Sequence, residues 1–142
     1  MSLTFVLDCS AALSWIFASE ATPATDGLLD QLSAGAKAWV PALWHLEVGN
    51  VLLSAQRRGR IDRAGREKFL SSLEVYDIEV DSQTVAVAWA KTVVLGESFG
   101  LTVYDAAYLE LALRKGIPLA SLDAQLCSAL KKAGGRLVLP SI

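Results

Sequence analysis

The segment from Leu101 to Asp123, LTVYDAAYLELALRKGIPLASLD, decides how the fold is predicted. Thr102 is a favourable N-cap residue, and we expect a helix to begin after it and to end at Gly116. The apolar run that follows, Ile117–Ala120, has the length of a buried strand. The segment therefore predicts a helix, a turn and a short strand, with Asp123 just past that strand.

The two acidic residues of this expected helix face different ways. At 100° per residue, Asp105 lies in the first turn on the side of Tyr108 and Ala112, which we expect to be buried. Glu110 has Arg114 four residues later, and we expect it to face outward. A carboxylate on a buried helix face needs a partner. The segment offers none to Asp105, so we expect a cation from outside the chain to neutralise it.

Strand and helix signals alternate along the rest of the sequence. We expect strands at residues 3–7, 38–40, 78–80, 117–120 and 136–139, and helices near residues 10–17, 23–34, 42–58, 62–73, 82–96, 102–115 and 124–132. We expect Ser10 to cap the first of these helices. The alternation predicts an α/β fold with a central, mostly parallel sheet of four or five strands and helices on both faces. The length favours one domain over residues 1–142.

The composition is that of an ordered globular protein, with 53% apolar and 20% charged residues. The net charge of −2 does not by itself favour nucleic acid, so such a role needs a local basic patch or metal ions. Charged residues interrupt every apolar run well before the ~18 residues that would span a membrane. Cys9 and Cys127 lack zinc-site spacing, and we expect reduced thiols in a cytoplasmic protein. We expect the four tryptophans to lie mainly in the core.

Four acidic residues are expected at one edge of the predicted sheet. Functional sites of such sheets form beyond the carboxyl ends of the strands. Asp8 and Asp123 each follow a strand directly. Glu47 comes early in the helix after the second strand, and Asp105 begins the helix that leads back to the fourth strand. The topology therefore brings together four carboxylates that are far apart in the sequence.

Carboxylates gathered in this way need a counter-ion. Two of them about 5 Å apart repel by about 3 kcal/mol at an effective dielectric constant of 20. Without a cation the cluster would bind protons or move apart. An acidic site of oxygen ligands suits Mg²⁺ or Mn²⁺ and favours phosphodiester hydrolysis by metal-activated water. Four small polar residues beside the acids are placed to orient them: Ser10, Asn50, Thr102 and Ser121.

Four short motifs resemble those of PIN-domain ribonucleases, in particular VapC-type toxins of bacterial toxin–antitoxin pairs. In the family's order, they are FVLDCSAAL, PALWHLEVGNVL, LTVYDAAYLELA and LASLDAQL. The resemblance implies a PIN fold and a Mg²⁺-dependent endoribonuclease that acts as a toxin on RNA. It implies that the catalytic and metal-binding quartet is Asp8, Glu47, Asp105 and Asp123, with Ser10 in support. It also implies a homodimer and a small antitoxin that folds over the active site.

Two positions depart from the family's pattern. Cys9 stands where a small or hydroxyl residue is usual. The last motif contains Asp123 but no second acid nearby. The metal ligands expected from this motif are therefore the least well defined.

Other interpretations of individual residues stay open. Asp8, Asp105 and Asp123 are each also explained as acids at the start of a helix. The basic cluster around Arg57, Arg58 and Arg60 either contacts an RNA backbone or is a solvated helix end.

Alternative functions are a PIN-fold nuclease in RNA or DNA maturation, or a metal-binding signalling domain of the receiver type. The receiver type would need paired acids after the first strand, where Asp8 stands single.

Overall fold

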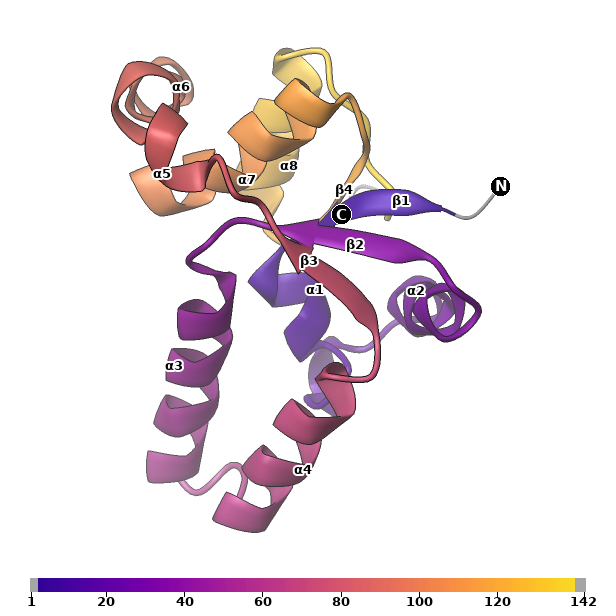
Figure 1. Ribbon diagram of the computed structural model, residues 1–142. Coiled ribbons are helices and arrows are strands. Elements are labelled where there is room, and N and C mark those ends of the chain that lie inside the picture. Colours follow the sequence, from indigo (N-terminus) through magenta and orange to yellow (C-terminus); the bar gives the residue numbers. More distant parts are fainter. Residues whose placement is uncertain (1–2, 140–142) are drawn as a thin grey trace.

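Four short strands form the centre of the computed structural model, which describes residues 3–139 (Figure 1). They are β1 (Thr4–Leu7), β2 (Lys37–Val40), β3 (Asp77–Val80) and β4 (Leu119–Ala120), all parallel and in the order β3-β2-β1-β4. Residues 5–7 of the central strand β1 are completely buried. A continuous apolar run predicts this, because such a strand is covered on both faces.

The helices cover both faces of the sheet (Figure 1). On one face lie α1 (Cys9–Leu13), α2 (Pro23–Ser33), α3 (Trp44–Arg57) and α4 (Arg63–Leu73), with a 3-10 turn at Ala18–Glu20. On the other face lie α7 (Val103–Lys115) and α8 (Ala124–Lys132). Between β3 and α7 the chain forms α5 (Thr84–Val87), a π-helical turn (Ala88–Thr92) and α6 (Val93–Phe99). No helix of the described residues is long and apolar enough to cross a membrane. The predicted α/β class with a parallel sheet is confirmed.

Short polar side chains set helix starts where the sequence predicts them. Thr22, Asp62 and Thr102 cap α2, α4 and α7, each accepting a hydrogen bond from the backbone N–H three residues later. Gly116 ends α7 with φ of +64°, a conformation that glycine adopts without the steric cost of a side chain. These ends depend on local chemistry, which is why the sequence alone locates them.

The helix after β1 differs from the prediction. It ends at Leu13 instead of near residue 17, and Asp8 occupies the N-cap position without a side-chain capping bond. Ser10 was expected to cap this helix, but its hydroxyl donates to the Asp8 carboxylate at 2.7 Å. The helix begins at Cys9, so Ser10 lies inside its first turn, and the Ser10 hydroxyl oxygen accepts from the backbone N–H of Leu122 instead of capping the helix.

The strand predicted at residues 136–139 is also wrong. Only one bridge, between Leu137 and Leu119, joins this segment to β4 within the described residues. β4 itself is two residues long, and Pro118 before it has no N–H to extend the ladder. The sheet therefore has four strands, the lower of the two numbers predicted.

The helix predicted over residues 82–96 forms as one continuous helical stretch from α5 through the π-helical turn to α6, but several of its apolar residues face outward. Val85, Trp89 and Val93 are 81%, 90% and 42% exposed. Trp89 is therefore an exception to the expectation that the tryptophans lie mainly in the core. An apolar stripe predicts that a helix face is covered, but it does not say that the chain's own core covers it.

Glu110 was expected to face solvent, and this is wrong as well, since it is only 5% exposed. The predicted pair with Arg114 exists, with Nε of Arg114 at 2.8 Å from the glutamate Oε2. Arg114 also donates to Asp81, the residue that follows β3, at 3.1 Å through Nη1. The pair is buried because α6 and the π-helical turn pack against α7, which the local sequence does not reveal.

Candidate active site

The structure brings Asp8, Glu47, Asp105 and Asp123 to the edge beyond the carboxyl ends of the strands. Asp8 follows β1 and Asp123 follows β4, while the other two lie in the first turns of α3 and α7. Their charges influence one another in every pairing except that of Glu47 with Asp123. Four residues separated by up to 115 positions in the chain thus form one acidic cluster, as the topology predicts.

Asp8 is the most deeply buried of the four, with 6% of its surface exposed. Two hydroxyls hold it: Ser10 Oγ and Ser121 Oγ donate to the same oxygen, Oδ2, at 2.7 and 2.6 Å. Burial raises the pKa of Asp8, the two hydroxyl bonds oppose that rise, and the charges of Asp105 and Asp123 add to it. Asp8 therefore has a fixed orientation and an unfavourable electrostatic environment.

Ser10 and Ser121 also tie the loop after β4 to the start of α1. The Ser10 hydroxyl accepts from the backbone N–H of Leu122 at 2.9 Å. The Ser121 hydroxyl accepts from the N–H of Asp123 at 3.0 Å. Each serine thus joins the Asp8 carboxylate to the segment that carries Asp123, which fixes the two acids relative to each other.

Glu47 is oriented by Tyr108, a residue for which the sequence suggested only core packing. The Tyr108 hydroxyl donates to Glu47 Oε1 at 2.5 Å, across 61 positions of the chain. Burial raises the pKa of Glu47, the tyrosine bond opposes the rise, and Asp8 and Asp105 add to it. The available signal was that a buried tyrosine usually finds a hydrogen-bond partner, and Tyr108 is completely buried on the face of α7 that carries Asp105.

Asp105 and Asp123 occupy the starts of α7 and α8. The N–H of Asp105 donates to the Thr102 hydroxyl at 3.1 Å. The pKa of Asp105 is raised by burial and by the charge of Asp123, while Thr102 opposes the rise. Asp123 caps α8, with its Oδ1 accepting from the Leu126 N–H at 3.0 Å. Capping uses one oxygen of this carboxylate, so it does not exclude a second role for Asp123.

Other predicted residues form no hydrogen bond or ion pair with the four acids among the described residues. Asn50 is exposed, and no hydrogen bond among the described residues involves its side chain. Arg57, Arg58 and Arg60 are exposed at the opposite end of α3, about 15 Å from Glu47 at 1.5 Å per residue. Arg60 lies over the Phe17 ring at 4.3 Å.

Both cysteines are free and buried near the acids. Burial and the charges of Asp8 and Glu47 raise the pKa of Cys9 to about 12, so it remains a neutral thiol. Cys127 packs in α8 with its sulfur directed to the Ser121 carbonyl at 3.5 Å. Neither cysteine shows the lowered pKa that a reactive thiol requires.

The cluster fits a hard divalent cation in its chemistry. The ion pairs among the described residues involve Lys37, Arg66 and Arg114, and none includes the four acids. Hydrogen bonds of the described side chains occupy one oxygen each of Asp8, Glu47 and Asp123. No three Asp, Glu, His or Cys side chains in residues 3–139 are close enough to enclose one ion. Mg²⁺ needs no such cage, because it keeps several waters and takes only one or two carboxylates.

Comparison with known proteins places this arrangement in a known family. The family model described as "PIN domain" matches residues 5–132, which is most of the chain. No curated protein matches the sequence closely enough to count as a relative.

Solved structures share the fold at low sequence identity. PAE2754 from Pyrobaculum aerophilum has a TM-score of 0.70 and 24% identity, with 97% of this chain and 85% of that chain covered. A toxin–antitoxin complex from Klebsiella pneumoniae has a TM-score of 0.56 and 15% identity, with 84% and 87% covered. VapBC2 from Rickettsia felis, bound to a DNA fragment from its promoter, has a TM-score of 0.61 and 11% identity, with 89% and 93% covered.

Proposed function

The chain belongs to the PIN-domain family of nucleases, and from this premise we propose that it is a Mg²⁺- or Mn²⁺-dependent endoribonuclease that acts as a toxin. One observation carries the proposal: four carboxylates repel one another at the sheet edge, and no cation of the described chain pairs with them. A divalent cation that also binds a substrate phosphate would relieve this repulsion.

Asp8, Glu47, Asp105 and Asp123 would provide the carboxylate ligands, one or two to each metal ion, with water supplying the other ligands. When bound, the metal supplies a Lewis acid and lowers the pKa of a water that attacks the phosphodiester. The chain's other residues act by orientation. The hydroxyls of Ser10 and Ser121 orient the Asp8 carboxylate by donating to its Oδ2. The Tyr108 hydroxyl orients the Glu47 carboxylate by donating to its Oε1. Thr102 and Ser121 place the backbones of Asp105 and Asp123.

RNA as the substrate rests on the family resemblance and on the exposed basic end of α3. Arg57, Arg58 and Arg60 would contact the backbone of an RNA that runs from the acids along this helix. Replacing Arg57 and Arg58 together by alanine should reduce the slope of log affinity against log salt by up to about 1.4 for single-stranded RNA. An unchanged slope, with Lys132→Ala as the control, would leave the cluster as a solvated helix end.

A small antitoxin and a second copy of the chain are the proposed partners. The neighbour from Klebsiella pneumoniae is a toxin–antitoxin complex, which supports an antitoxin for a chain of the same fold. The exposed residues Val85, Trp89 and Val93 offer an apolar surface that a homodimer would cover. Membership of the PIN family removes the receiver-type alternative.

The direct test is an assay of the purified protein on structured RNAs with Mg²⁺ and with EDTA. We expect cleavage that leaves a 5′-phosphate and a 3′-hydroxyl, and that EDTA abolishes. Cleavage that continues in EDTA would contradict the proposal.

A nuclease of RNA or DNA maturation is the second candidate, because the same site would serve it. Growth arrest on expression, relieved by a small protein encoded beside the gene, supports the toxin. Harmless expression with cleavage of one precursor supports maturation.

A further inference from the structure

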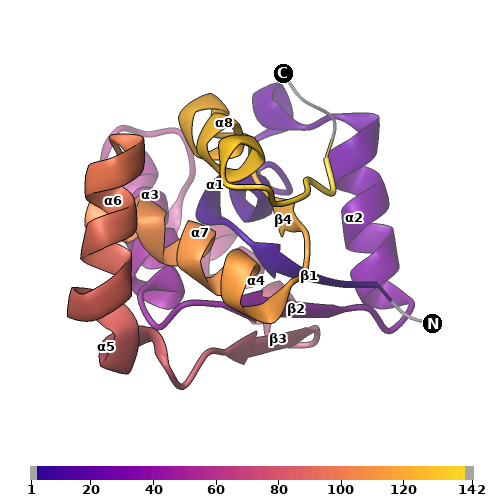
Figure 2. The same ribbon diagram turned by 90° about the horizontal axis from the view of Figure 1, so that it is seen from above.

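Helix α3 has an acid of the candidate active site at its beginning and arginines at its end. Glu47 lies in its first turn, Arg57 is its last residue and Arg58 is its C-cap. Figure 1 shows α3 running away from the sheet, and Figure 2 shows the arrow of β1 pointing to the side of the molecule on which α3 lies. The acids and the arginines are therefore at opposite ends of one helix.

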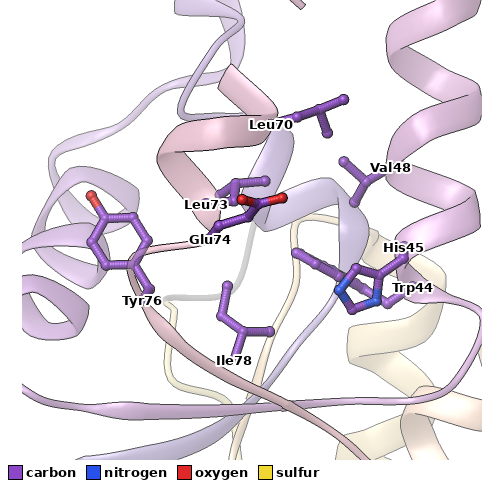
Figure 3. Close-up of a pocket in the computed structure, with 8 residues that line it drawn as sticks. All are labelled: Trp44, His45, Val48, Leu70, Leu73, Glu74, Tyr76 and Ile78. Atoms are coloured by element: carbon purple, nitrogen blue, oxygen red, sulfur yellow. The ribbon is translucent and has the colours of Figure 1, made fainter. Parts of the chain in front are cut away.

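One side of α3 connects these two ends. At about 100° per residue, Ser54 and Arg58 each lie within about 20° of Glu47 around the helix axis. Trp44 and Val48 point instead into a recess of about 300 Å³ between α3 and α4 (Figure 3). Glu47, Ser54 and Arg58 thus form a strip along α3, which we call the α3 strip, and it does not face α4.

The α3 strip is accessible to solvent. Glu47 and Ser54 are half-buried, and Arg58 is exposed. Asn50, which lies about 60° from Glu47 at the edge of the strip, is exposed as well. A nucleic-acid strand that leaves the four acids along this side of α3 therefore meets polar side chains as far as Arg58.

Ser54 holds the Arg58 guanidinium on the strip. Nη2 of Arg58 donates to Ser54 Oγ at 3.2 Å, four residues back along the helix toward the acids. No ion pair among the described residues includes Arg58, so the chain leaves its charge without an acidic partner. A guanidinium has several N–H groups in a planar fork, and a single bond to Ser54 leaves most of them for an anion.

The neighbouring arginines are placed differently. Arg57 lies about 80° from Glu47 around the helix axis, so it is off the α3 strip. Arg60 follows the helix, and its guanidinium lies over the Phe17 ring at 4.3 Å. Of these three arginines, Arg58 is thus the one that the structure directs along the strip.

The length of the strip limits how many nucleotides it can span. Ser54 lies seven residues after Glu47, which corresponds to about 10 Å at 1.5 Å per residue. The Arg58 guanidinium is at the level of Ser54, because it bonds that hydroxyl. Nucleotides rise about 3.4 Å each along a stacked strand, and more along a stretched one, so the strip spans about two or three nucleotides.

We propose that Arg58, held by Ser54, binds a phosphate of the RNA strand two or three nucleotides from the bond that is cut. This inference rests on the proposed function, because it needs an RNA whose cleaved bond lies at the four acids. Arg58 is a positioning residue, since it does not touch the reacting atoms. Binding energy from the remote phosphate would place the cleaved bond at the acids.

The phosphate contact is measured first without cleavage. A fluorescein-labelled oligouridine of about 12 nucleotides is titrated against the metal-free chain in EDTA by fluorescence anisotropy. Arg58→Ala should weaken binding about fivefold and lower the slope of log affinity against log salt by about 0.7. Arg57→Ala removes the same charge from the adjacent residue and should weaken binding less than about twofold. Equal losses would overturn the proposal, because net charge alone would then explain them.

Two conservative variants separate a positioned guanidinium from a positive charge alone. Ser54→Ala keeps the charge of Arg58 but removes the hydroxyl that holds it, and alanine favours the helix, so the fold is kept. Arg58→Lys keeps the charge but lacks the planar fork. Each should weaken oligouridine binding about threefold. Full binding by both variants would contradict a built phosphate site.

The position of the bound phosphate is read on an RNA that the chain cleaves at a mapped bond. Each phosphate in turn is replaced by an uncharged methylphosphonate, and kcat/KM is measured for each RNA. Replacement two or three nucleotides from the cut should lower kcat/KM about fivefold with the unaltered chain and have little effect with Arg58→Ala. The same pattern of losses in both proteins would mean that this phosphate is bound elsewhere.

These outcomes distinguish the phosphate site from the proposed function. Cleavage that EDTA abolishes, with a pattern of losses that Arg58→Ala does not change, would keep the nuclease and remove the phosphate site. Oligouridine binding that depends on Arg58, without cleavage of any RNA tested, would refute the proposed function and with it the spacing inferred here.

Discussion

Helix α7 contributes to two groups of buried or half-buried carboxylates, and among the described residues only one group contains a cation. Near its C-terminal end, Arg114 bonds both Glu110 and Asp81. Burial alone would raise the pKa of Asp81, but the hydrogen bonds and charge of Arg114, together with hydrogen bonds from the Gln83 backbone and Thr84, outweigh burial and lower this pKa. At the N-terminal end of α7, the charge of Asp105 acts on Asp8 and Glu47, and the pKa values of all three acids are raised.

The difference separates a structural group of acids from the group that we propose to be functional. In the Arg114 group the fold itself supplies the positive charge, so the cluster is complete when the chain folds. In the acidic cluster at the sheet edge the fold supplies hydroxyls that orient the acids but no cation. A buried acid that the chain leaves without a cation is the better indicator of a binding site, because something outside the chain must compensate its charge.

The largest effect is expected from removing one acid of the functional group. Asp8→Asn or Asp105→Asn should lower RNA cleavage by more than about 100-fold, since loss of the residues that merely orient metal ligands already costs 10–100-fold. Cleavage is measured with Mg²⁺ in excess. The metal-free variants should be at least as stable as the unaltered chain in urea, because repulsion is relieved.

Asp26→Asn, an exposed acid in the first turn of α2, serves as the matched control for charge loss and should cleave normally. Full activity in Asp8→Asn or Asp105→Asn would remove these acids from the site.

Breaking the structural group should affect stability instead of chemistry. Arg114→Met leaves Glu110 and Asp81 buried without a cation, and it should reduce the free energy of unfolding by about 3 kcal/mol. Urea denaturation measures this loss. Arg66→Met removes a pair with the exposed Glu67 and a hydrogen bond to Gln56, and it should cost about 1 kcal/mol. Equal losses in the free energy of unfolding for the two variants would mean that burial of the Arg114 group does not make its ion pairs more important for stability.

Tyr108→Phe tests how the functional group is oriented. It deletes the hydroxyl that holds Glu47 and should weaken Mn²⁺ binding about tenfold or more, measured by calorimetry without RNA. Tyr104→Phe, on the same helix but 67% exposed, is the control and should bind as the unaltered chain does. If Tyr108→Phe binds Mn²⁺ normally, the tyrosine contributes only packing.

The smallest effect expected is a dependence of stability on pH. Asp8, Glu47 and Asp105 have raised pKa values in the folded chain, so the metal-free folded state holds protons that the unfolded state has lost. Their contribution to stability therefore falls as pH rises above about 4, the ordinary range of carboxyl groups. Asp81, with its lowered pKa, contributes stability that is lost as pH falls below that range.

Thermal melts of the metal-free chain should show the decline at higher pH, and Mg²⁺ should reverse it by binding the charged acids. Asp8→Asn should make the decline shallower. A metal-free stability that rises steadily through neutral pH would contradict the raised pKa values.

Local patterns were enough to predict the fold class and the convergence of the four acids. Strands that alternate with helices require a parallel sheet, and a parallel sheet brings the residues after each strand to one edge. Thr102, Asp62 and Gly116 mark helix ends by chemistry within a few residues of themselves. Each of these inferences uses only neighbours in the chain or a general rule of topology.

Tertiary structure alone decided which partner each polar or apolar group received. Tyr108 reaches Glu47 across 61 positions and Arg114 reaches Asp81 across 33, and no local period encodes such pairs. Trp89 is on an apolar stripe yet lies outside the core. An apolar stripe indicates that a helix face is covered, but it does not indicate which part of the protein, or which partner, covers it. The sequence therefore determined where charge would gather. Packing determined which charges the protein neutralises itself and which it leaves for a ligand.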